Sequence, residues 1–244
     1  MPLTRHGFRE MLIGSLVLVA VAVVLGWWWW PVSFLVLPVL IWLFAFFRDP
    51  DRKLPTEQHA MVSPADGKVS DVTDLPHDEL LGGPCVRVGI FLSVFNVHVN
   101  RAPCDGRVVN VIYKEGKFIN AMKHDSASSD NESNTVVLAE PKGERPVVVV
   151  KQIVGLIARR IICTVKNGDL VQRGDRIGMI KFGSRTELYI PKWLEPQVKV
   201  TVGDSVRGAA DVIALLGKPI HTESTQPADV GEEFEPLVGR ETPA

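Results

Sequence analysis

The chain has 244 residues, 46% of them hydrophobic and 23% charged, which is enough to bury one good-sized core with a small appendage. Its formal net charge of -1 gives no sign of a nucleic-acid binder, which needs a basic face to neutralise phosphates. The three cysteines, Cys85, Cys104 and Cys163, fit neither a disulfide framework nor a zinc-ligand spacing, so a reducing compartment is the simpler interpretation.

Residues 1–48 are predicted to anchor the chain in a membrane. Residues 11–47 contain no Asp, Glu, Lys or Arg, and this run is too long for a signal-peptide core. About 20 helical residues cross a bilayer, so the run has room for two short spans. Residues 27–30 are all Trp and are followed by Pro31, which predicts a turn between two helices. One long tilted span is the alternative.

Basic residues flank the apolar run, with Arg5 and Arg9 before it and Arg48, Arg52 and Lys53 after it. The positive-inside rule then places both ends in the cytoplasm, which a transmembrane helical hairpin satisfies and a single span does not. We therefore expect a protein of the cell (inner) membrane whose large domain faces the cytoplasm.

The rest of the chain divides into a linker, a domain and a tail. Residues 49–60 are polar and include Pro50 and Pro55, which predicts a linker. In residues 61–218, short β-branched runs alternate with Gly-Asp or Asp-Gly turns, which predicts a mainly β domain. Residues 219–244 are rich in Pro, Thr and Glu with little hydrophobic periodicity, and are predicted to be disordered.

Two internal echoes refine the architecture. Residues 64–69 are repeated in pattern by residues 103–108, and residues 165–171 by residues 200–206. Repeated Gly-Asp-x-Val turns between short strands resemble the biotinyl and lipoyl carrier domains, so we predict a barrel-sandwich of two related halves. Gly-Asp turns also recur in unrelated β proteins, and that alternative stays open.

The segment Phe182-Gly183-Ser184-Arg185 lies between two β-like runs, where a tight turn can press a backbone carbonyl against the next hydroxyl. Ser184 Oγ would attack the Gly183 carbonyl, and elimination from the resulting ester would leave a dehydroalanine that hydrolyses to a pyruvoyl group. Glycine suits the upstream position because it tolerates strained backbone angles. A Gly-Ser dipeptide alone is usually a turn, so the surrounding sequence decides. The segment is similar to the processing site of the short bacterial form of phosphatidylserine decarboxylase proenzymes, which depend on a pyruvoyl group.

This resemblance extends from about residue 61 to residue 207 and includes a Ser-Pro-Ala-Asp-Gly block that contains Asp66. It implies that Asp66 belongs to the charge network that drives self-cleavage. The alternative is that Asp66 and Gly67 form only a hairpin turn.

A second matching block, residues 91–103, places His98 inside an alternating strand. The resemblance implies that His98 is a general acid and base near neutral pH, although a lone strand histidine is more often structural. Longer family members carry a second histidine where this chain has Arg101. Whether His98 serves self-cleavage, decarboxylation or both therefore stays open.

Two further matching blocks supply candidates for binding the substrate phosphate. Lys117 and Lys123 lie in or beside a polar stretch that resembles the family's polar loop, and Arg159 belongs to a pair of adjacent arginines. A solvated loop is the alternative for the lysines.

The resemblance implies a carboxy-lyase that converts phosphatidylserine in the membrane to phosphatidylethanolamine, in phospholipid biosynthesis. Its cofactor would be the pyruvoyl group formed from Ser184, which serves as an electron sink. The fragments 1–183 and 184–244 are expected to stay associated, nucleic acid is not an expected partner, and a homo-oligomer is left open. A membrane-anchored biotinyl/lipoyl-like adaptor or carrier without catalysis is the alternative. No metal site is predicted, because the six histidines show no metal-ligand spacing.

Overall fold

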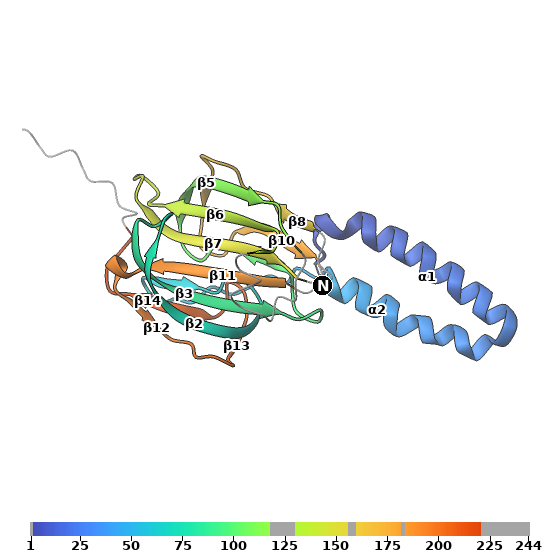
Figure 1. The fold of residues 1–244 in the computed structure, drawn as a ribbon. Helices are drawn as coiled ribbons and strands as arrows, with labels where there is room; N and C mark the ends of the chain where they lie inside the picture. The colour runs from blue at the N-terminus through green and yellow to red at the C-terminus, as the bar shows by residue number, and fades with distance from the viewer. Residues whose placement is uncertain (1, 118–129, 156–159, 182–183, 221–244) are drawn as a thin grey trace, which may run out of the picture.

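The computed structural model describes residues 2–117, 130–155, 160–181 and 184–220. A β-rich domain forms one end of the molecule, and a long apolar helical segment projects from it (Figure 1). The prediction of a mainly β domain behind an apolar N-terminal segment is confirmed.

The apolar segment Arg5–Phe46 is a single candidate membrane span by length and composition. Helical residues run through it without a break, as the 3-10 helices η1 (Arg5–Gly7) and η2 (Trp30–Leu35) and the α-helices α1 (Phe8–Trp29) and α2 (Val36–Phe46). The prediction of two helices separated by a non-helical turn at residues 27–30 is therefore corrected, because the connection between α1 and α2 is the 3-10 helix η2. Trp27 and Trp28 lie in the last turn of α1, and Trp29 has an extended backbone at the start of η2, with φ -155° and ψ 102°. Pro31 lies in the first turn of η2, where its missing N–H removes no helical hydrogen bond.

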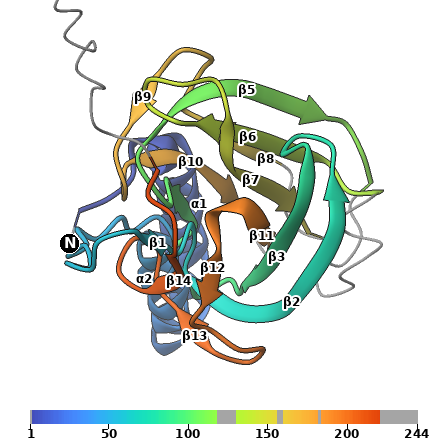
Figure 2. The same cartoon turned by 90° about the vertical axis from the view of Figure 1, so that its left-hand side faces the viewer.

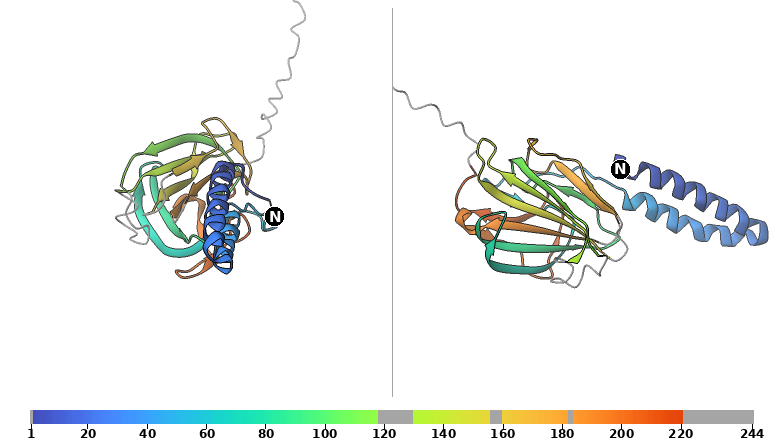
Figure 3. Two further views of the ribbon diagram at one scale, coloured as in Figure 1. Left: turned by 90° about the vertical axis from the view of Figure 1, so that its right-hand side faces the viewer. Right: turned by 45° about the horizontal axis from the view of Figure 1, so that its top comes forward.

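The two ends of this segment nevertheless meet at the β domain. The Thr4 N–H donates to the Phe47 carbonyl, and the Asp49 N–H donates to the Pro2 carbonyl, each at 2.9 Å. The helices α1 and α2 accordingly lie side by side in both views that show their length (Figures 1 and 3). Their apolar side chains are mostly exposed, as lipid-facing residues would be.

The main sheet has eight strands, all paired antiparallel, and curls into a half-barrel (Figure 2). In spatial order the strands are β13 (Ser205–Val206), β2 (Gly67–Asp78), β3 (Gly83–Leu92), β11 (Ser184–Pro191), β7 (Pro146–Val154), β6 (Ser133–Ala139), β5 (Gly106–Lys114) and β9 (Leu170–Val171).

Two small antiparallel sheets lie inside the curl (Figure 2). One consists of β1 (Ala60–Val62), β14 (Val212–Leu216) and β12 (Pro196–Val198), and the other of β4 (Val99–Arg101), β10 (Arg176–Lys181) and β8 (Arg160–Cys163). A 3-10 turn, η3 (Lys192–Leu194), follows β11. The inner face of the large sheet packs against the small sheets through one core that includes Ile90, Leu188, Met61, Ile177 and Ile213. Alternation along the strands puts every second side chain into this core.

The internal echoes of the sequence fall at equivalent places in this fold. Gly67 of β2 pairs with Val206 of β13, and Gly106 of β5 pairs with Val171 of β9. In both halves the residue two places after the glycine donates its N–H to the carbonyl of the turn aspartate at 2.8 Å. The prediction of two related halves agrees with this pairing, whereas the likeness to carrier domains stays a prediction.

The predicted linker and tail differ in how far the structure describes them. Asp49 in the linker is buried and accepts from Arg101 at 2.7 Å and from Arg176 at 2.5 Å, so the linker is fixed to the domain by ion pairs. The tail lies outside the described residues except for Pro219 and Ile220.

Candidate active site

Ser184 is the first residue of β11, at one end of the curled sheet. It pairs with Leu92 of β3 and with Val154 of β7, so neighbouring strands hold it on both sides. Because side chains alternate along a strand, Ser184 points to the same inner face as Thr186 and Leu188. Its side chain is completely buried, and its Oγ has no hydrogen-bond partner among the described residues.

His98 lies directly before β4 and is also completely buried. Its Nδ1 is 2.9 Å from the Asn96 carbonyl, which selects the tautomer with the proton on Nδ1 and leaves Nε2 as a proton acceptor. Within the described part of the chain, Nε2 has no partner. Burial lowers the pKa of His98 to about 4, with a smaller lowering from the charge of Arg48, so the ring is neutral near pH 7.

The fold brings His98 and Ser184 to the same end of the domain. The Ile180 N–H donates to the His98 carbonyl at 3.2 Å, so the start of β4 lies beside the end of β10, which leads into Ser184. Deeper in the domain, the Asn100 amide donates to Thr186 Oγ1 at 3.0 Å. Along the chain, His98 lies two residues before Asn100 and directly precedes β4, and Ser184 lies two residues before Thr186 at the start of β11. Both are two residues away from the contact, and Ser184, which lies within β11, is on the face that carries Thr186.

A ladder of buried amides supports this contact. The Gln152 amide donates to Asn100 Oδ1 at 2.8 Å, and the Asn134 amide donates to Gln152 Oε1 at 2.9 Å. All three side chains are buried, and buried polar groups that satisfy one another fix a single arrangement. The ladder therefore ties β4, β7 and β6 to the strand that begins with Ser184.

Asp66 lies directly before β2, close to this end of the sheet. Lys68 and Arg185 both pair with Phe91 of β3, so the starts of β2 and β11 lie two strand spacings apart, about 10 Å. The Asp66 carboxylate accepts from the Gly208 N–H at 2.7 Å and from Arg52 at 2.6 Å. Burial raises the pKa of Asp66 against these contacts. The Asn96 carbonyl, and not Asp66, accepts from His98 Nδ1, so the role of Asp66 in activating His98 stays a prediction.

Comparison with known proteins identifies the family. Residues 39–214 match the family model described as phosphatidylserine decarboxylase. A phosphatidylserine decarboxylase proenzyme of Rhodopirellula baltica is 44% identical over 217 residues, which cover 88% of each chain. One of Syntrophus aciditrophicus is 47% identical over 174 residues, which cover 70% of this chain and 79% of the relative.

The chain belongs to the phosphatidylserine decarboxylase family. Its activity is that of a carboxy-lyase, as the four sequence blocks predicted, and the alternative of an adaptor or carrier without catalysis is set aside.

Within this family member, Arg185 occupies a place that sequence reasoning did not assign. Its side chain is completely buried on the outer face of the sheet. Its Nε donates to Glu187 at 2.8 Å, and its other nitrogens donate to Ser70 Oγ at 2.5 Å and to Asp71. A side chain at Gly89 would collide with the guanidinium, which explains the glycine. The alternation of Arg185 and Glu187 within a strand was the available signal for this buried ion pair.

The predicted phosphate-binding residues are only partly described. Lys117 is exposed and pairs with Asp130 at 3.3 Å. Lys123 and Arg159 lie outside the described residues, as does Gly183. Arg101, at the position of the longer members' second histidine, donates to Asp49 at 2.7 Å and to the Gly174 carbonyl at 3.1 Å. Arg101 therefore fastens the linker that follows the apolar segment to the domain.

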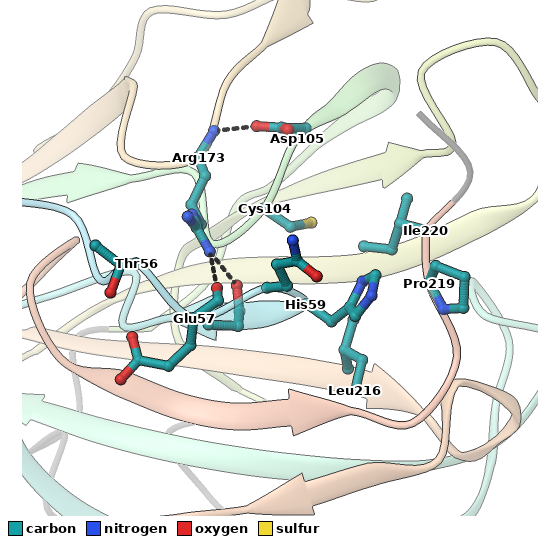
Figure 4. Close-up of a pocket in the computed structure, with 11 residues that line it drawn as sticks. Thr56, Glu57, His59, Cys104, Asp105, Arg173, Leu216, Pro219 and Ile220 are labelled. Atoms are coloured by element: carbon teal, nitrogen blue, oxygen red, sulfur yellow. Dashed lines mark hydrogen bonds between the residues drawn. The ribbon is translucent and has the colours of Figure 1, made fainter. Parts of the chain in front are cut away.

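A pocket of about 460 Å³ lies apart from Ser184. It is formed around the linker and the end of β14, and its lining includes His59, Asp105, Arg173 and Leu216 (Figure 4). The Arg173 side chain donates to the Glu57 and Ala60 carbonyls at its wall. None of the predicted catalytic residues lines this pocket.

Proposed function

We propose that this decarboxylase forms its own pyruvoyl group by cutting its chain between Gly183 and Ser184. The main support is the pair of buried polar atoms, Ser184 Oγ and His98 Nε2, that lack partners at one end of the domain within the described residues. Buried polar groups are nearly always hydrogen-bonded, so two unpaired ones in one region favour a chemical role. These residues fit a pyruvoyl group at position 184, because the strand that would carry it is held on both sides.

In the first step, His98 Nε2 accepts the proton of the Ser184 hydroxyl, and the freed Oγ adds to the Gly183 carbonyl carbon. The proton then passes to the amide nitrogen, and the carbon–nitrogen bond breaks. The peptide bond becomes an ester, and residue 184 has a free amine. A neutral buried histidine is in the protonation state that this step requires.

In the second step, loss of the Cα proton of residue 184 expels Gly183 as a carboxylate and leaves a carbon–carbon double bond. Tautomerisation to an imine and addition of water then release ammonia. The products are a chain of residues 1–183 and a chain of residues 184–244 that begins with the pyruvoyl group. When present, this group supplies an electron sink for decarboxylation of a substrate that bears an amine.

The sheet explains how the two products would remain one enzyme. After the cut, β11 belongs to the small chain, whereas its neighbours β3 and β7 belong to the large chain. The new terminus at residue 184 is therefore held by backbone pairing to the other fragment. We propose that the fragments stay associated for this reason.

The test is the intact mass and the gel pattern of the purified protein. The parent should give two fragments, with a small chain that resists Edman degradation because its first residue has no amine. Ser184→Ala should remain one uncut chain. Ser205→Ala, which changes the first and exposed residue of β13, is the matched control and should be cut like the parent. Cutting of Ser184→Ala, or a readable serine terminus on the whole small chain, would refute self-processing.

We also propose that Arg5–Phe46 is embedded in the cell membrane with both ends on the cytoplasmic side. Its two ends meet through the Thr4 to Phe47 hydrogen bond, and α1 with 22 residues is roughly 33 Å long, enough to cross a bilayer core. This placement brings the domain next to phosphatidylserine. Leu3→Cys and Thr56→Cys, each in a Cys163→Ser background, should be labelled in intact cells from the same side. Labelling from opposite sides would contradict the topology.

A further inference from the structure

We propose that the end of the membrane segment forms a wall of the active site, in which Phe46 positions His98 and Glu10 holds the strand that leads into the cleavage site. The inference rests on the proposed self-cleavage. It adds that the membrane segment contributes residues that position the groups needed for that cleavage. It makes Phe46 and Glu10 positioning residues, which act through His98 and through the start of β11.

The contact between Phe46 and His98 is the first observation. The ring centroids are 4.3 Å apart with an interplanar angle of 32°, and both side chains are buried. Phe46 belongs to a separate apolar cluster that also contains Met11 of α1, Leu43 of α2 and Met179 of β10. Most of the apolar segment is exposed, so its burial is concentrated where it meets the catalytic end. The Phe46–His98 contact is therefore part of a packed interface between the membrane segment and the β domain.

The ion pair between Glu10 and Lys181 is the second observation, and it is independent of the first. Lys181 is the last residue of β10, is 5% exposed, and donates to Glu10 of α1 at 2.5 Å. Its ammonium also lies 5.9 Å from the centre of the Phe47 ring. Two residues farther along the chain is Gly183, followed by Ser184. The membrane segment therefore fixes the position from which the scissile peptide departs.

Phe46 affects the protonation of His98, because its ring covers the imidazole and helps to exclude water from it. Without that cover, the imidazole could be solvated when protonated, and its pKa would rise from about 4 toward its ordinary value of 6.5. The charged groups on the surrounding elements are Arg48, after α2, and the paired Lys181 and Glu10. Arg48 opposes protonation, and the other two charges offset each other. Phe46 therefore acts on the His98 pKa by limiting the access of water to the imidazole.

The first experiment measures the His98 pKa directly, by NMR of labelled histidine in the full-length Ser184→Ala chain in detergent. Adding Phe46→Ala should raise this pKa toward 6.5. Phe46→Met, which keeps an apolar cover, should leave it near the parent value. Phe44→Ala changes an exposed residue of the same helix and is the matched control. An unchanged His98 pKa in Phe46→Ala would overturn the role of Phe46.

The second experiment measures self-cleavage of the same variants with Ser184 intact. A shift of the pKa to 6.5 should slow Phe46→Ala by about tenfold at pH 5.5, where the ring would be mostly protonated, without slowing it at pH 8. Phe46→Met should restore the parent profile and serves as the readable variant if Phe46→Ala does not fold. If the pKa moves but the cleavage profile does not, His98 is not the base and Phe46 does not act on cleavage through it, although the ring contact and self-cleavage both stand. If the parent chain is not cut at all, the proposed function fails.

The ion pair is tested by Glu10→Gln, with Arg9→Gln on the same exposed turn as the control. Glu10→Gln should slow cleavage several-fold at every pH without moving the His98 pKa, because it loosens the strand end and not the histidine. Lys181→Met should slow cleavage too, and the double variant should be no slower than Lys181→Met alone. Additive effects of the two changes would overturn the claim that this pair holds the strand.

Discussion

The two sets of echoed segments, one around β1 and β2 and the other around β4 and β5, make equivalent strand pairings but have different surroundings. His59 lies directly before β1 and His98 directly before β4, and each is the same distance in sequence from its echoed segment, residues 64–69 or residues 103–108. Each histidine carbonyl accepts from the strand beside it, from Leu216 at 3.1 Å and from Ile180 at 3.2 Å. His59 is exposed at the pocket of Figure 4, whereas His98 is buried beneath Phe46. The scaffold alone therefore does not make the site. The end of the apolar segment, which covers His98, and β11, which carries Ser184, make the difference.

Asp66 and Asp105 extend the comparison. Each accepts a backbone N–H at 2.7 Å from the opposite turn, Gly208 in one half and Arg173 in the other. This contact belongs to the fold, because it occurs in the half that lacks Ser184. Asp66 differs in being buried and in its ion pair with Arg52. Any special role of Asp66 must come from that difference.

The largest expected effect separates the two histidines. His98→Ala should slow self-cleavage by about 100-fold or more, the usual loss on removing a general base, whereas His59→Ala should stay within about twofold. Band intensities on a gel over time measure both. Parent-like cleavage of both variants would mean that Ser184 is activated by strain or by another group. Normal cleavage of His98→Ala without decarboxylation would assign His98 to the second reaction.

The second expected effect is a loss of folding stability at low pH that is caused by the buried His98. The folded pKa of about 4 lies below the unfolded value, so the unfolded chain binds the proton more readily. Stability is therefore full above about pH 7 and falls as the pH drops from about 6.5 to about 4, by on the order of 3 kcal/mol. Unfolding of uncut Ser184→Ala in detergent should show this loss. Adding His98→Gln should remove that part of the pH dependence, and an unchanged pH dependence would contradict the burial of His98.

The smallest expected effect separates the two aspartates. Asparagine keeps the oxygen that accepts the backbone N–H but loses the charge that pairs with Arg52. Asp66→Asn should therefore slow self-cleavage by about tenfold, whereas Asp105→Asn should change it less than about twofold. The same gel assay measures both. Equal rates for the two variants would show that Asp66, like Asp105, only closes a turn.

Much of this protein could be predicted from local sequence. A run of residues without charges predicts a membrane segment wherever it occurs, because the bilayer responds to composition. The Gly-Asp turns and alternating strands predict a mainly β domain with two related halves, because turn chemistry and side-chain alternation act within a few residues. The Phe182 to Arg185 motif and the four matching blocks predicted the family for the same reason, since the proposed self-cleavage needs a fixed order of adjacent residues.

The tertiary structure decided which side chains surround that motif. The Phe46 cover on His98, the Asn96 carbonyl at its Nδ1 and the burial of Arg185 against Asp71 depend on how strands and helices pack and pair. The path of the apolar segment through Pro31 also depends on the hydrogen bonds that join its two ends, Thr4 to Phe47 and Asp49 to Pro2. Local sequence propensity does not predict such long-range contacts. Burial and solvent exclusion are sums over segments far apart in the chain. They set the protonation of His98, and no short stretch of sequence contains them.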